Sequence, residues 1–251
     1  MKPQSREMDL ELIRGRYRAR MAQSAADVRA AQALRQAAFR GRDGVDADAF
    51  DHRCLHVLVE ELETARLVCC FRLMRLNDGR QIGKSYAAQH YELSALTVFK
   101  GPMVELGRFC IAKDTTDPDI LRIAWAALTA YVDREGVQML FGCSSFSGTE
   151  AEPHADAFAM LRESHLAPKH WLPKVKAPQV LRFAERFRTR PDRSRALRAM
   201  PPLLRTYLAM GGWVSDHAVV DRDLGTLHVF TGLEISAIPA ARKRLLRTVA
   251  G

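Results

Sequence analysis

A helix enclosed by two apolar strands restricts the fold of this chain more than any other feature of its sequence. Asp117 and Pro118 suit the cap and the first position of a helix, which Gly136 would end. Residues 103–113 (MVELGRFCIAK) precede this helix and residues 137–146 (VQMLFGCSSF) follow it, and both stretches have the composition of strands. Strands joined by a helix pair in parallel within one sheet. The sequence therefore predicts a parallel step within an α/β fold.

The other expected elements flank this step and favour antiparallel pairing. Short turns separate two of the predicted strand pairs, as in hairpins. Residues 77–100 have no regular pattern. The expected elements are strands at 17–23, 56–61, 65–75, 213–220 and 226–231 and helices at 24–40 and 153–165. We therefore predict a mixed, mostly antiparallel central sheet flanked by helices, in one domain over residues 1–251 with a core at 14–168 and a basic segment and final hairpin at 169–251.

Positive charge is concentrated in the last third of the chain. The net charge of the protein is +9. Residues 1–168 contain 22 Lys and Arg against 23 Asp and Glu, a net charge of −1, whereas residues 169–251 contain 16 against 6, a net charge of +10. This asymmetry predicts an acidic partner, which would be nucleic acid, an anionic membrane surface or an acidic carrier protein. A solvated basic face without a partner is the remaining alternative.

The cysteines and the hydropathy pattern limit the class of protein further. The five cysteines form no C-x-x-C pair, and four of them lie in apolar, strand-like runs. We therefore expect buried reduced thiols rather than disulfides or a metal site. No run reaches the roughly 18 apolar residues of a membrane-spanning helix, and the charged N-terminus is unlike a signal peptide. These features predict a cytoplasmic protein. The cysteines are Cys54, Cys69, Cys70, Cys110 and Cys143.

Glu105, inside the predicted strand at 103–113, is the candidate general base. Its apolar neighbours would partly desolvate the carboxylate, and desolvation raises the pKa of an acid toward the range that suits a base. A bulge near Gly107 would re-aim Glu105 or Arg108, and bulges are frequent beside active sites. The alternative is a Glu–Arg ion pair that fastens two strands.

Several stretches resemble the ornithine N-acyltransferases, which share their plan with the acyl-homoserine-lactone synthases. The shared pattern consists of Asp46-Ala-Asp48-Ala-Phe50-Asp51, Cys54, His56, Arg72 and ELGRF at 105–109. The segments FGCSSFSGT (141–149), HLAP (165–168) and GGWVSDHAVVDRDLGTLHVFTGLE (211–234) also resemble the ornithine enzymes and are not typical of the lactone synthases. The resemblance runs from about residue 30 to residue 247.

The resemblance implies a GNAT-type fold and an acyl-transfer reaction. An acyl carrier protein would donate a 3-hydroxyacyl chain, the α-amine of L-ornithine would accept it, and lyso-ornithine lipid would be the product. Because the amine must lose a proton before it attacks a thioester, one positioned base suffices, and Glu105 is assigned that role. A backbone N–H near residues 109–111 would stabilise the oxyanion.

Further residues are assigned on the same basis, each with a structural alternative. Asp48, Asp51 and Arg72 would bind ornithine, or else form a turn and a structural ion pair. The acyl–pantetheine arm would contact Arg108, Phe109, Cys110, Ile111, Ser144 and Ser145, although serines at a strand end often serve only the turn. The carrier protein would dock on Arg182, Arg186, Arg188 and Arg190.

The stretch between the predicted strand at 103–113 and the following helix argues against coenzyme A as the donor. Acetyl-coenzyme A users of this fold carry a glycine-rich phosphate loop there. Here residues 111–118 read IAKDTTDP, without glycine and with Asp114 and Asp117, which would repel a pyrophosphate. We therefore expect no resident cofactor and no metal, with the phosphopantetheine arriving on the carrier protein.

Two alternative functions belong to other classes. An acyl-homoserine-lactone synthase would use S-adenosylmethionine, but the segment at 211–234 weighs against it. A nucleic-acid- or membrane-binding protein without catalysis would explain the basic segment. Few aromatic residues alternate with its arginines, however, so we expect no nucleic-acid partner and retain peripheral contact with an anionic inner membrane.

Overall fold

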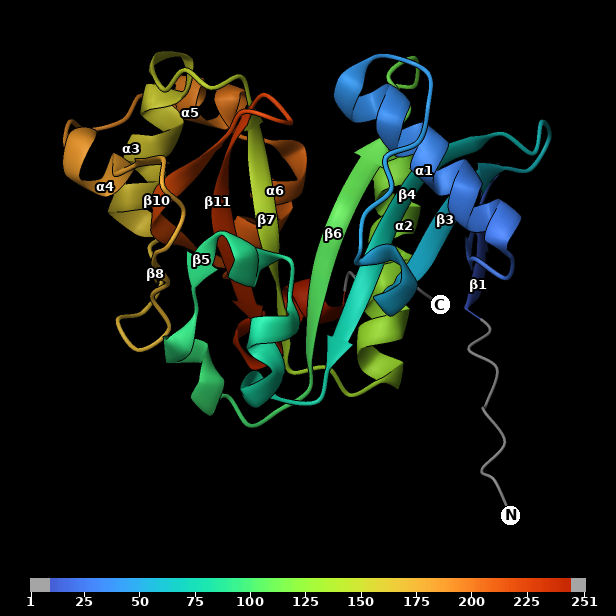
Figure 1. Cartoon of the computed structure of the whole chain (residues 1–251), viewed down its shortest axis with the longest axis horizontal. Helices are drawn as coiled ribbons and strands as arrows, with labels where there is room; N and C mark the ends of the chain where they lie inside the picture. The colour runs from blue at the N-terminus through green and yellow to red at the C-terminus, as the bar shows by residue number, and fades with distance from the viewer. Residues whose placement is uncertain (1–9, 245–251) are drawn as a thin grey trace. The chain divides into compact units, whose positions relative to one another are not determined.

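The structure, a computed structural model, describes residues 10–244 and divides into two compact units (Figure 1). Unit 1 comprises the described parts of residues 1–73, 108–136 and 243–251, and unit 2 comprises residues 74–107 and 137–242. The chain crosses from one unit to the other inside strands β4 (Leu67–Leu76) and β6 (Met103–Ile111).

Unit 1 is built on an antiparallel meander of strands. β1 (Glu11–Arg14) pairs with β2 (Tyr17–Met21), β2 with β3 (Leu55–Glu61), and β3 with β4. Alternation along β2 buries its odd-numbered residues, which are Tyr17, Ala19 and Met21. The sequence analysis did not predict β1, which is short and largely exposed.

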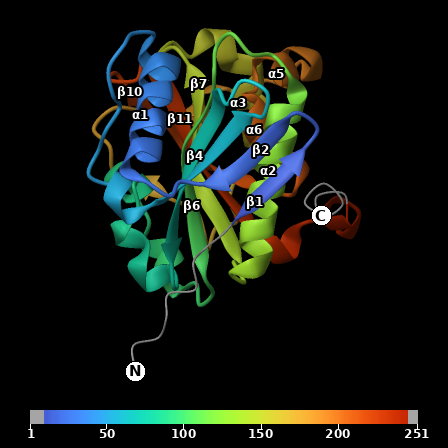
Figure 2. The same ribbon diagram turned by 90° about the vertical axis from the view of Figure 1, so that its right-hand side faces the viewer.

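Two helices cover the strands of unit 1. Helix α1 (Ala25–Arg40) begins at a capping box, in which the Ser24 hydroxyl accepts from the Asp27 N–H and the Asp27 carboxylate accepts from the Ser24 N–H. Its Ala31 packs with Leu58 and Cys70 on one face of the sheet. Helix α2 (Pro118–Arg134) contacts mainly β1 and β2, and Figure 2 shows α1 and α2 on opposite sides of these strands.

The boundaries of α2 confirm the predicted helix. The Asp117 side chain accepts from the N–H of Asp119, and Pro118 occupies the first turn. At the other end Gly136 has φ +60°, in the left-handed region that glycine adopts without a steric penalty. Thus the cap residues decide where this helix starts and stops.

Unit 2 contains the parallel step. β6 pairs in parallel with β7 (Met139–Ser147), and β7 pairs antiparallel with β11 (Thr226–Glu234). Strands β10 (Trp213–Asp221) and β9 (Val180–Leu181) continue this order by antiparallel pairing. The predicted mixed, mostly antiparallel sheet and the predicted final hairpin are confirmed.

The two faces of the unit 2 strands have different covers. On one face, Phe146, Val229 and Ala218 pack against a helical layer. The layer consists of α3 (Ala155–Ser164), α4 (Phe183–Arg186), α5 (Arg193–Ala199) and α6 (Pro202–Ala209). The other face carries Tyr91 and the irregular stretch predicted at 77–100.

That irregular stretch consists of short 3-10 helices and one short strand pair. The helices are η2 (Gly79–Lys84), η3 (Ala87–Gln89) and η4 (Ser94–Val98), and β5 (Tyr91–Glu92) pairs with β8 (Lys174–Val175). The remaining short helices are η1 (Asp51–Arg53), η5 (Glu152–His154) and η6 (Ile235–Ala237).

The pairing of β6 with β7 ends in the middle of β6, where the β6 backbone becomes irregular. The register runs from Met103↔Met139 to Leu106↔Gly142. Two residues later Arg108 has φ +52°, which costs an L residue about 1–2 kcal/mol. Arg108 therefore marks a local irregularity of the β6 backbone next to Gly107, between Glu105 and the end of the strand at Ile111. The bulge itself stays a prediction.

All five cysteines are free thiols. Cys69, Cys70 and Cys110 are buried, as predicted, whereas Cys54 and Cys143 are half-buried. The prediction of buried thiols therefore holds for the three that lie in β4 and β6. Cys69 and Cys70 are adjacent and face opposite sides of β4, so both faces of that strand are covered.

Candidate functional site

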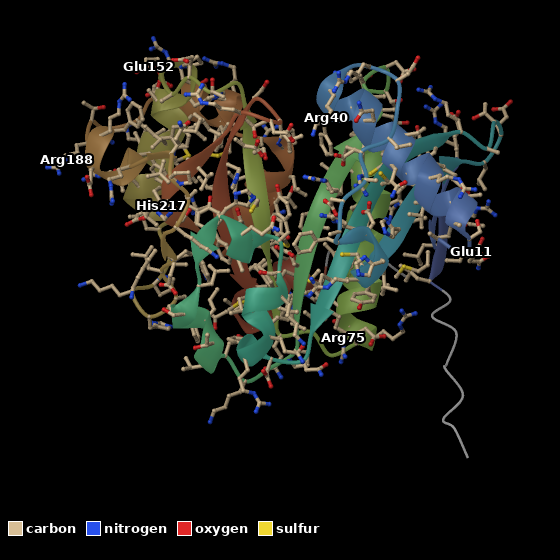
Figure 3. The ribbon with its side chains drawn as sticks, viewed as in Figure 1. Glu11, Arg40, Arg75, Glu152, Arg188 and His217 are labelled. Atoms are coloured by element: carbon tan, nitrogen blue, oxygen red, sulfur yellow. The ribbon has the colours of Figure 1, made fainter. Side chains whose placement is uncertain are left out.

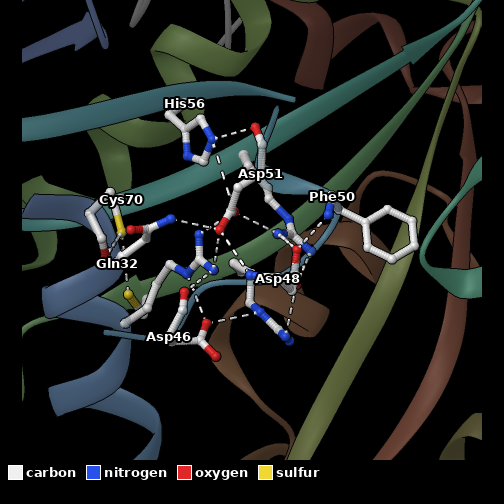
Figure 4. Close-up of polar contacts among 12 residues, drawn as sticks. Gln32, Asp46, Asp48, Phe50, Asp51, His56 and Cys70 are labelled. Atoms are coloured by element: carbon white, nitrogen blue, oxygen red, sulfur yellow. Dashed lines mark hydrogen bonds and ion pairs between the residues drawn. The ribbon is translucent and has the colours of Figure 1, made fainter. Parts of the chain in front are cut away.

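A cluster of arginines and aspartates lies in the interior of unit 1 (Figure 4). Its centre is Arg35, on α1, whose side chain is only 1% exposed. Arg35 Nε donates to Asp46 Oδ2 at 2.9 Å, and Nη1 donates to Asp51 Oδ1 at 2.7 Å. Its Nη2 also donates to the carbonyl oxygen of Asp46. One arginine therefore fixes both ends of the loop formed by residues 46–51.

Two further arginines, from β4 and β6, bind the same loop. Arg72 Nη1 donates to Asp48 Oδ1 at 2.6 Å and to Asp51 Oδ1 at 2.8 Å, and its Nη2 donates to Asp48 Oδ2 at 2.9 Å. Arg108 Nη2 donates to Asp48 Oδ2 at 3.1 Å, and its Nε lies 3.1 Å from Asp46 Oδ2. Bidentate arginine–carboxylate geometry of this kind fixes direction as well as charge.

Hydrogen bonds keep two aspartates of the cluster, Asp48 and Asp51, ionised. Burial alone would raise the pKa of Asp51, but the bonds from Arg35 and Gln32 outweigh it, so the pKa lies well below its usual value. Burial and the Arg72 bond act in the same opposed way on Asp48, whose pKa is also lowered. His56 is different, because burial lowers its pKa and leaves the ring neutral.

The formal charges of this cluster balance. Three arginines face three aspartates, and the neutral His56 ring contacts the carbonyl oxygen of Asp51 at 3.0 Å. The predicted Asp48, Asp51, Arg72 and Arg108 are thus brought together. Sequence reasoning missed Arg35 as a member. Its signal was an arginine in register with Ala31 and Ala38, on the apolar stripe of α1.

Glu105 lies in unit 2 and is fixed by backbone donors. Its side chain is buried, with the residue 4% exposed. Oε2 accepts from the Tyr86 N–H at 2.8 Å and Oε1 from the Ala87 N–H at 2.7 Å, at the start of η3. Each carboxylate oxygen has a second lone pair, so these bonds orient the group without exhausting its capacity to accept a proton.

A buried aromatic and imidazole group lies on the same face of unit 2 as the 77–100 stretch. The Tyr91 hydroxyl donates to the carbonyl oxygen of His228 at 2.8 Å and lies 3.2 Å from its Nδ1. Burial lowers the pKa of His228 to about 3, so the ring is neutral near pH 7. His217 Nδ1 lies 2.6 Å from Asp216 Oδ1. No local sequence pattern predicts this group, since Tyr91 and His228 are 137 residues apart.

The residues assigned to the acyl–pantetheine arm are distributed over two strands. In β6, Phe109 stacks on Phe71 with ring centroids 5.5 Å apart, and Cys110 Sγ lies 3.6 Å from Cys70 Sγ. Ile111 is half-buried. In β7, Ser144 is buried and accepts from the Thr231 hydroxyl, whereas Ser145 is exposed. Successive strand residues face opposite ways, so one face of β7 presents only one of these serines.

The assigned docking arginines are exposed along the surface of unit 2. Arg182 and Arg186 form ion pairs with Glu185 and Glu152, respectively. Arg188 donates from Nε to the carbonyl oxygen of Glu185, and Figure 3 shows its side chain at the outer edge of the unit. Arg190 is also exposed. All four assigned arginines are therefore exposed, and two of them are paired with glutamates.

Comparison with known proteins places this chain in a family. A GNAT acetyltransferase domain model matches residues 29–126. L-ornithine N(alpha)-acyltransferase of Rhodobacter capsulatus is 33% identical over 238 residues, covering 88% of this chain and 91% of that protein. The chain belongs to the L-ornithine N(alpha)-acyltransferase family. The Brucella abortus member is 30% identical and covers 89% of this chain and 86% of its own length.

Solved structures agree on the fold of this L-ornithine N(alpha)-acyltransferase family member. FeeM, an N-acyl amino acid synthase from uncultured soil microbes, aligns with a TM-score of 0.51 and 12% identity, covering 91% of this chain and 99% of that chain. The GNAT fold is thereby confirmed, and the protein is an acyltransferase. Among residues 10–244, no helix is both long and apolar enough to cross a bilayer.

Proposed function

We propose that this protein transfers a 3-hydroxyacyl chain from an acyl carrier protein to the α-amine of L-ornithine, and that lyso-ornithine lipid is the product. The observation that carries the proposal is similarity along nearly the whole chain to proteins named L-ornithine N(alpha)-acyltransferase. In the reaction a C–N bond forms and the thioester C–S bond breaks. The ammonium group loses one proton before it attacks, and the nitrogen loses a second as the amide forms. The departing pantetheine thiolate takes up this second proton and remains on the carrier as a thiol.

Glu105 is proposed to take the proton that the ammonium group loses before attack, directly or through a water molecule. Support comes from its burial and from the two N–H donors that hold its carboxylate in one orientation. A positioned base contributes about 10²–10⁴-fold to a rate. Backbone N–H groups of Phe109, Cys110 or Ile111 are proposed to stabilise the oxyanion, since the left-handed Arg108 changes the direction of the strand just before them.

Asp48, Asp51 and Arg72 are proposed to act on ornithine by shaping the loop at 46–51. Their charges are already matched within the cluster, so binding a zwitterionic amino acid there would exchange existing ion pairs. Asp48 is the most exposed of the three, with 22% of its side chain accessible, and is therefore the one proposed to contact the acceptor. Arg108 is proposed to hold Asp48 in place from β6.

The N-terminus of α2 supports a carrier-bound donor. In a GNAT-type fold this helix end would receive a pyrophosphate. Here the Asp117 carboxylate occupies the cap and accepts from the Asp119 N–H, and the Tyr17 hydroxyl donates to the same carboxylate. A second anion at this cap would meet a like charge. Phosphopantetheine, with one phosphodiester, is the better match.

The exposed arginines are proposed to dock the acidic carrier. Arg188 and Arg190 are the strongest candidates, because Arg182 and Arg186 already pair with glutamates. Changing both to alanine should raise the KM for the carrier protein and weaken its salt dependence, with kcat unchanged. An unchanged KM would remove the arginines from docking.

The reaction is tested by incubating the protein with 3-hydroxyacyl carrier protein and with ornithine, lysine or S-adenosylmethionine. An ornithine amide alone is expected. A lactone from S-adenosylmethionine, or no product with any acceptor, would contradict the proposal.

The base is tested with Glu105→Gln, for which we expect kcat to fall about 10²–10⁴-fold. Loss of the bonds to η3 alone would misplace the stretch at 85–88, so a matched variant is needed. Ser85→Ala serves, because the Ser85 hydroxyl donates to the carbonyl oxygen of Ile82 and accepts from the Ala88 N–H in the same stretch. An equal loss of activity in both variants would assign Glu105 to positioning rather than proton transfer.

A further inference from the structure

Three segments of unit 2 combine exposed cations with apolar side chains. Residues 78–84, 92–100 and 168–176 carry six Lys and Arg against Asp78 and Glu92. We call the exposed part of these segments the lysine face. It includes Arg80, Lys84, Val98, Lys100, Lys169 and Lys174, all of them exposed.

Contacts within unit 2 hold the three segments of the lysine face together. The Gly79 N–H donates to the carbonyl oxygen of Phe99 at 2.7 Å, which joins η2 to η4. The Phe99 ring meets Trp171 edge-on, with centroids 5.6 Å apart. Lys174 Nζ lies 3.9 Å from Glu92, and Lys176 Nζ donates to the carbonyl oxygen of Ala88. Figure 1 shows β5 and β8 near each other in unit 2, where they pair.

The apolar part of the lysine face includes Val98, the most exposed large hydrophobic residue among those that the structure describes. Val98 is 69% exposed, and beside it Phe99 and Trp171 are half-buried. Trp171 keeps its polar edge satisfied through a bond from Nε1 to Glu234. An aromatic pair and an exposed aliphatic side chain among cations are the features of a surface that rests on lipid headgroups.

Its lysines are available to an external anion. Lys84, Lys100 and Lys169 make no ion pair with any residue in the part of the chain that the structure describes. Lysine side chains extend apolar stems along a membrane while their ammonium groups reach the phosphates. Each lysine near an anionic surface strengthens binding about fivefold at low salt.

From these observations we propose that the lysine face binds an anionic phospholipid surface. A nucleic acid would gain nothing from Val98, and an acidic protein would need an apolar counterpart to it. The exposed arginines at 182–190 lie outside the three segments of the lysine face, and two of them, Arg182 and Arg186, already form ion pairs with glutamates. The proposal goes beyond the acyl transfer, and vesicle binding is measured without turnover.

The test is sedimentation with vesicles of phosphatidylcholine alone or mixed with phosphatidylglycerol. The native protein should bind the anionic vesicles and release them as salt rises. Lys100→Ala combined with Lys169→Ala should lower the partition coefficient about 25-fold, which is about fivefold for each lysine. Val98→Asp should weaken binding as well. Thermal melting should stay unchanged, because these side chains are exposed.

The matched control replaces Arg188 and Arg190, which lie outside the lysine face, with alanine and should leave vesicle binding within about twofold. Absence of binding by the native protein, equal binding to neutral vesicles, or an equal loss in the arginine variant would overturn the proposal. So would a lysine variant that keeps vesicle binding but shows a raised KM for the carrier protein, because the partner of the lysine face would then be an acidic protein. A failed ornithine assay would leave this result unaffected.

Discussion

Replacing Arg35 with methionine tests whether the buried cluster of unit 1 depends on its central arginine. The substitution keeps most of the side-chain volume and removes the guanidinium that joins Asp46 to Asp51. Removing one partner of a buried ion pair costs about 3–5 kcal/mol, because the remaining charge is left without compensation. Asp51 keeps Arg72 and Gln32 as partners, so we expect a loss near the lower end, about 3 kcal/mol.

The loss is measured by urea and thermal unfolding followed by circular dichroism. A change of about 3 kcal/mol corresponds to about 6–12 °C in Tm for a chain of this size. Arg29→Met is the control, because Arg29 is exposed on the same helix and its loss should change stability by no more than about 0.5 kcal/mol. Arg35→Lys keeps the charge without the bidentate geometry and should recover part of the loss.

The dependence on pH gives a second readout. The pKa of Asp51 is lowered in the folded state, so its contribution to stability is complete above the unfolded-state pKa of about 3.9 and is lost as the pH falls toward the folded-state pKa. The gap between the native protein and Arg35→Met should be constant from pH 8 to about 5 and narrow below about 4. A loss below 1 kcal/mol, or a gap that does not change with pH, would refute the role given to Arg35.

Three other outcomes are expected. Burial lowers the pKa of His228 to about 3, so below pH 6.5 the unfolded state binds a proton that the folded state does not. The free energy of unfolding should therefore fall by about 2 kcal/mol from pH 7 to pH 5. His228→Gln should reduce this pH dependence, as measured by urea titrations at each pH. Gly142→Ala would place a Cβ 2.3 Å from the Leu106 carbonyl oxygen, so calorimetry should show a loss of about 1–3 kcal/mol; an unchanged Tm would mean that β6 and β7 separate easily. Ser24→Ala should cost about 1 kcal/mol through the lost cap of α1, and no change in the urea midpoint would show that Asp27 caps the helix alone.

Local patterns predicted most of the regular elements. Helix α2 was predictable because Asp117, Pro118 and Gly136 mark its ends, and β7 because its apolar run suits a strand covered on both faces. β1 was missed because Glu11–Arg14 is short and largely exposed, so no alternation marks it. The 77–100 stretch has no period because its turns are held by side chains such as Ser85.

The candidate site was less accessible from sequence. Asp48, Asp51, Arg72 and Arg108 were recognised through a resemblance, but spacing alone does not say that they bind one another. The role of Arg35 required a long-range contact, since its partners lie 11 and 16 residues away in a loop. Arg35 is a charged residue at a core-facing position of α1, which departs from the hydrophobic pattern of the helix. Positions of this kind are often structural or functional polar sites, and pattern-based prediction fails there.

The balanced charge of the cluster also restricts how this protein can evolve. Each arginine forms ion pairs with two aspartates, and each aspartate forms ion pairs with two arginines. The six residues are therefore mutually dependent. Replacing one of the six residues leaves an unpaired charge in the interior, whereas replacing one arginine and one aspartate together keeps the net charge of the cluster at zero. Among relatives, these six positions should therefore change in compensating pairs or not at all. Their covariation should remain detectable in more distant relatives than the covariation of the surrounding core positions.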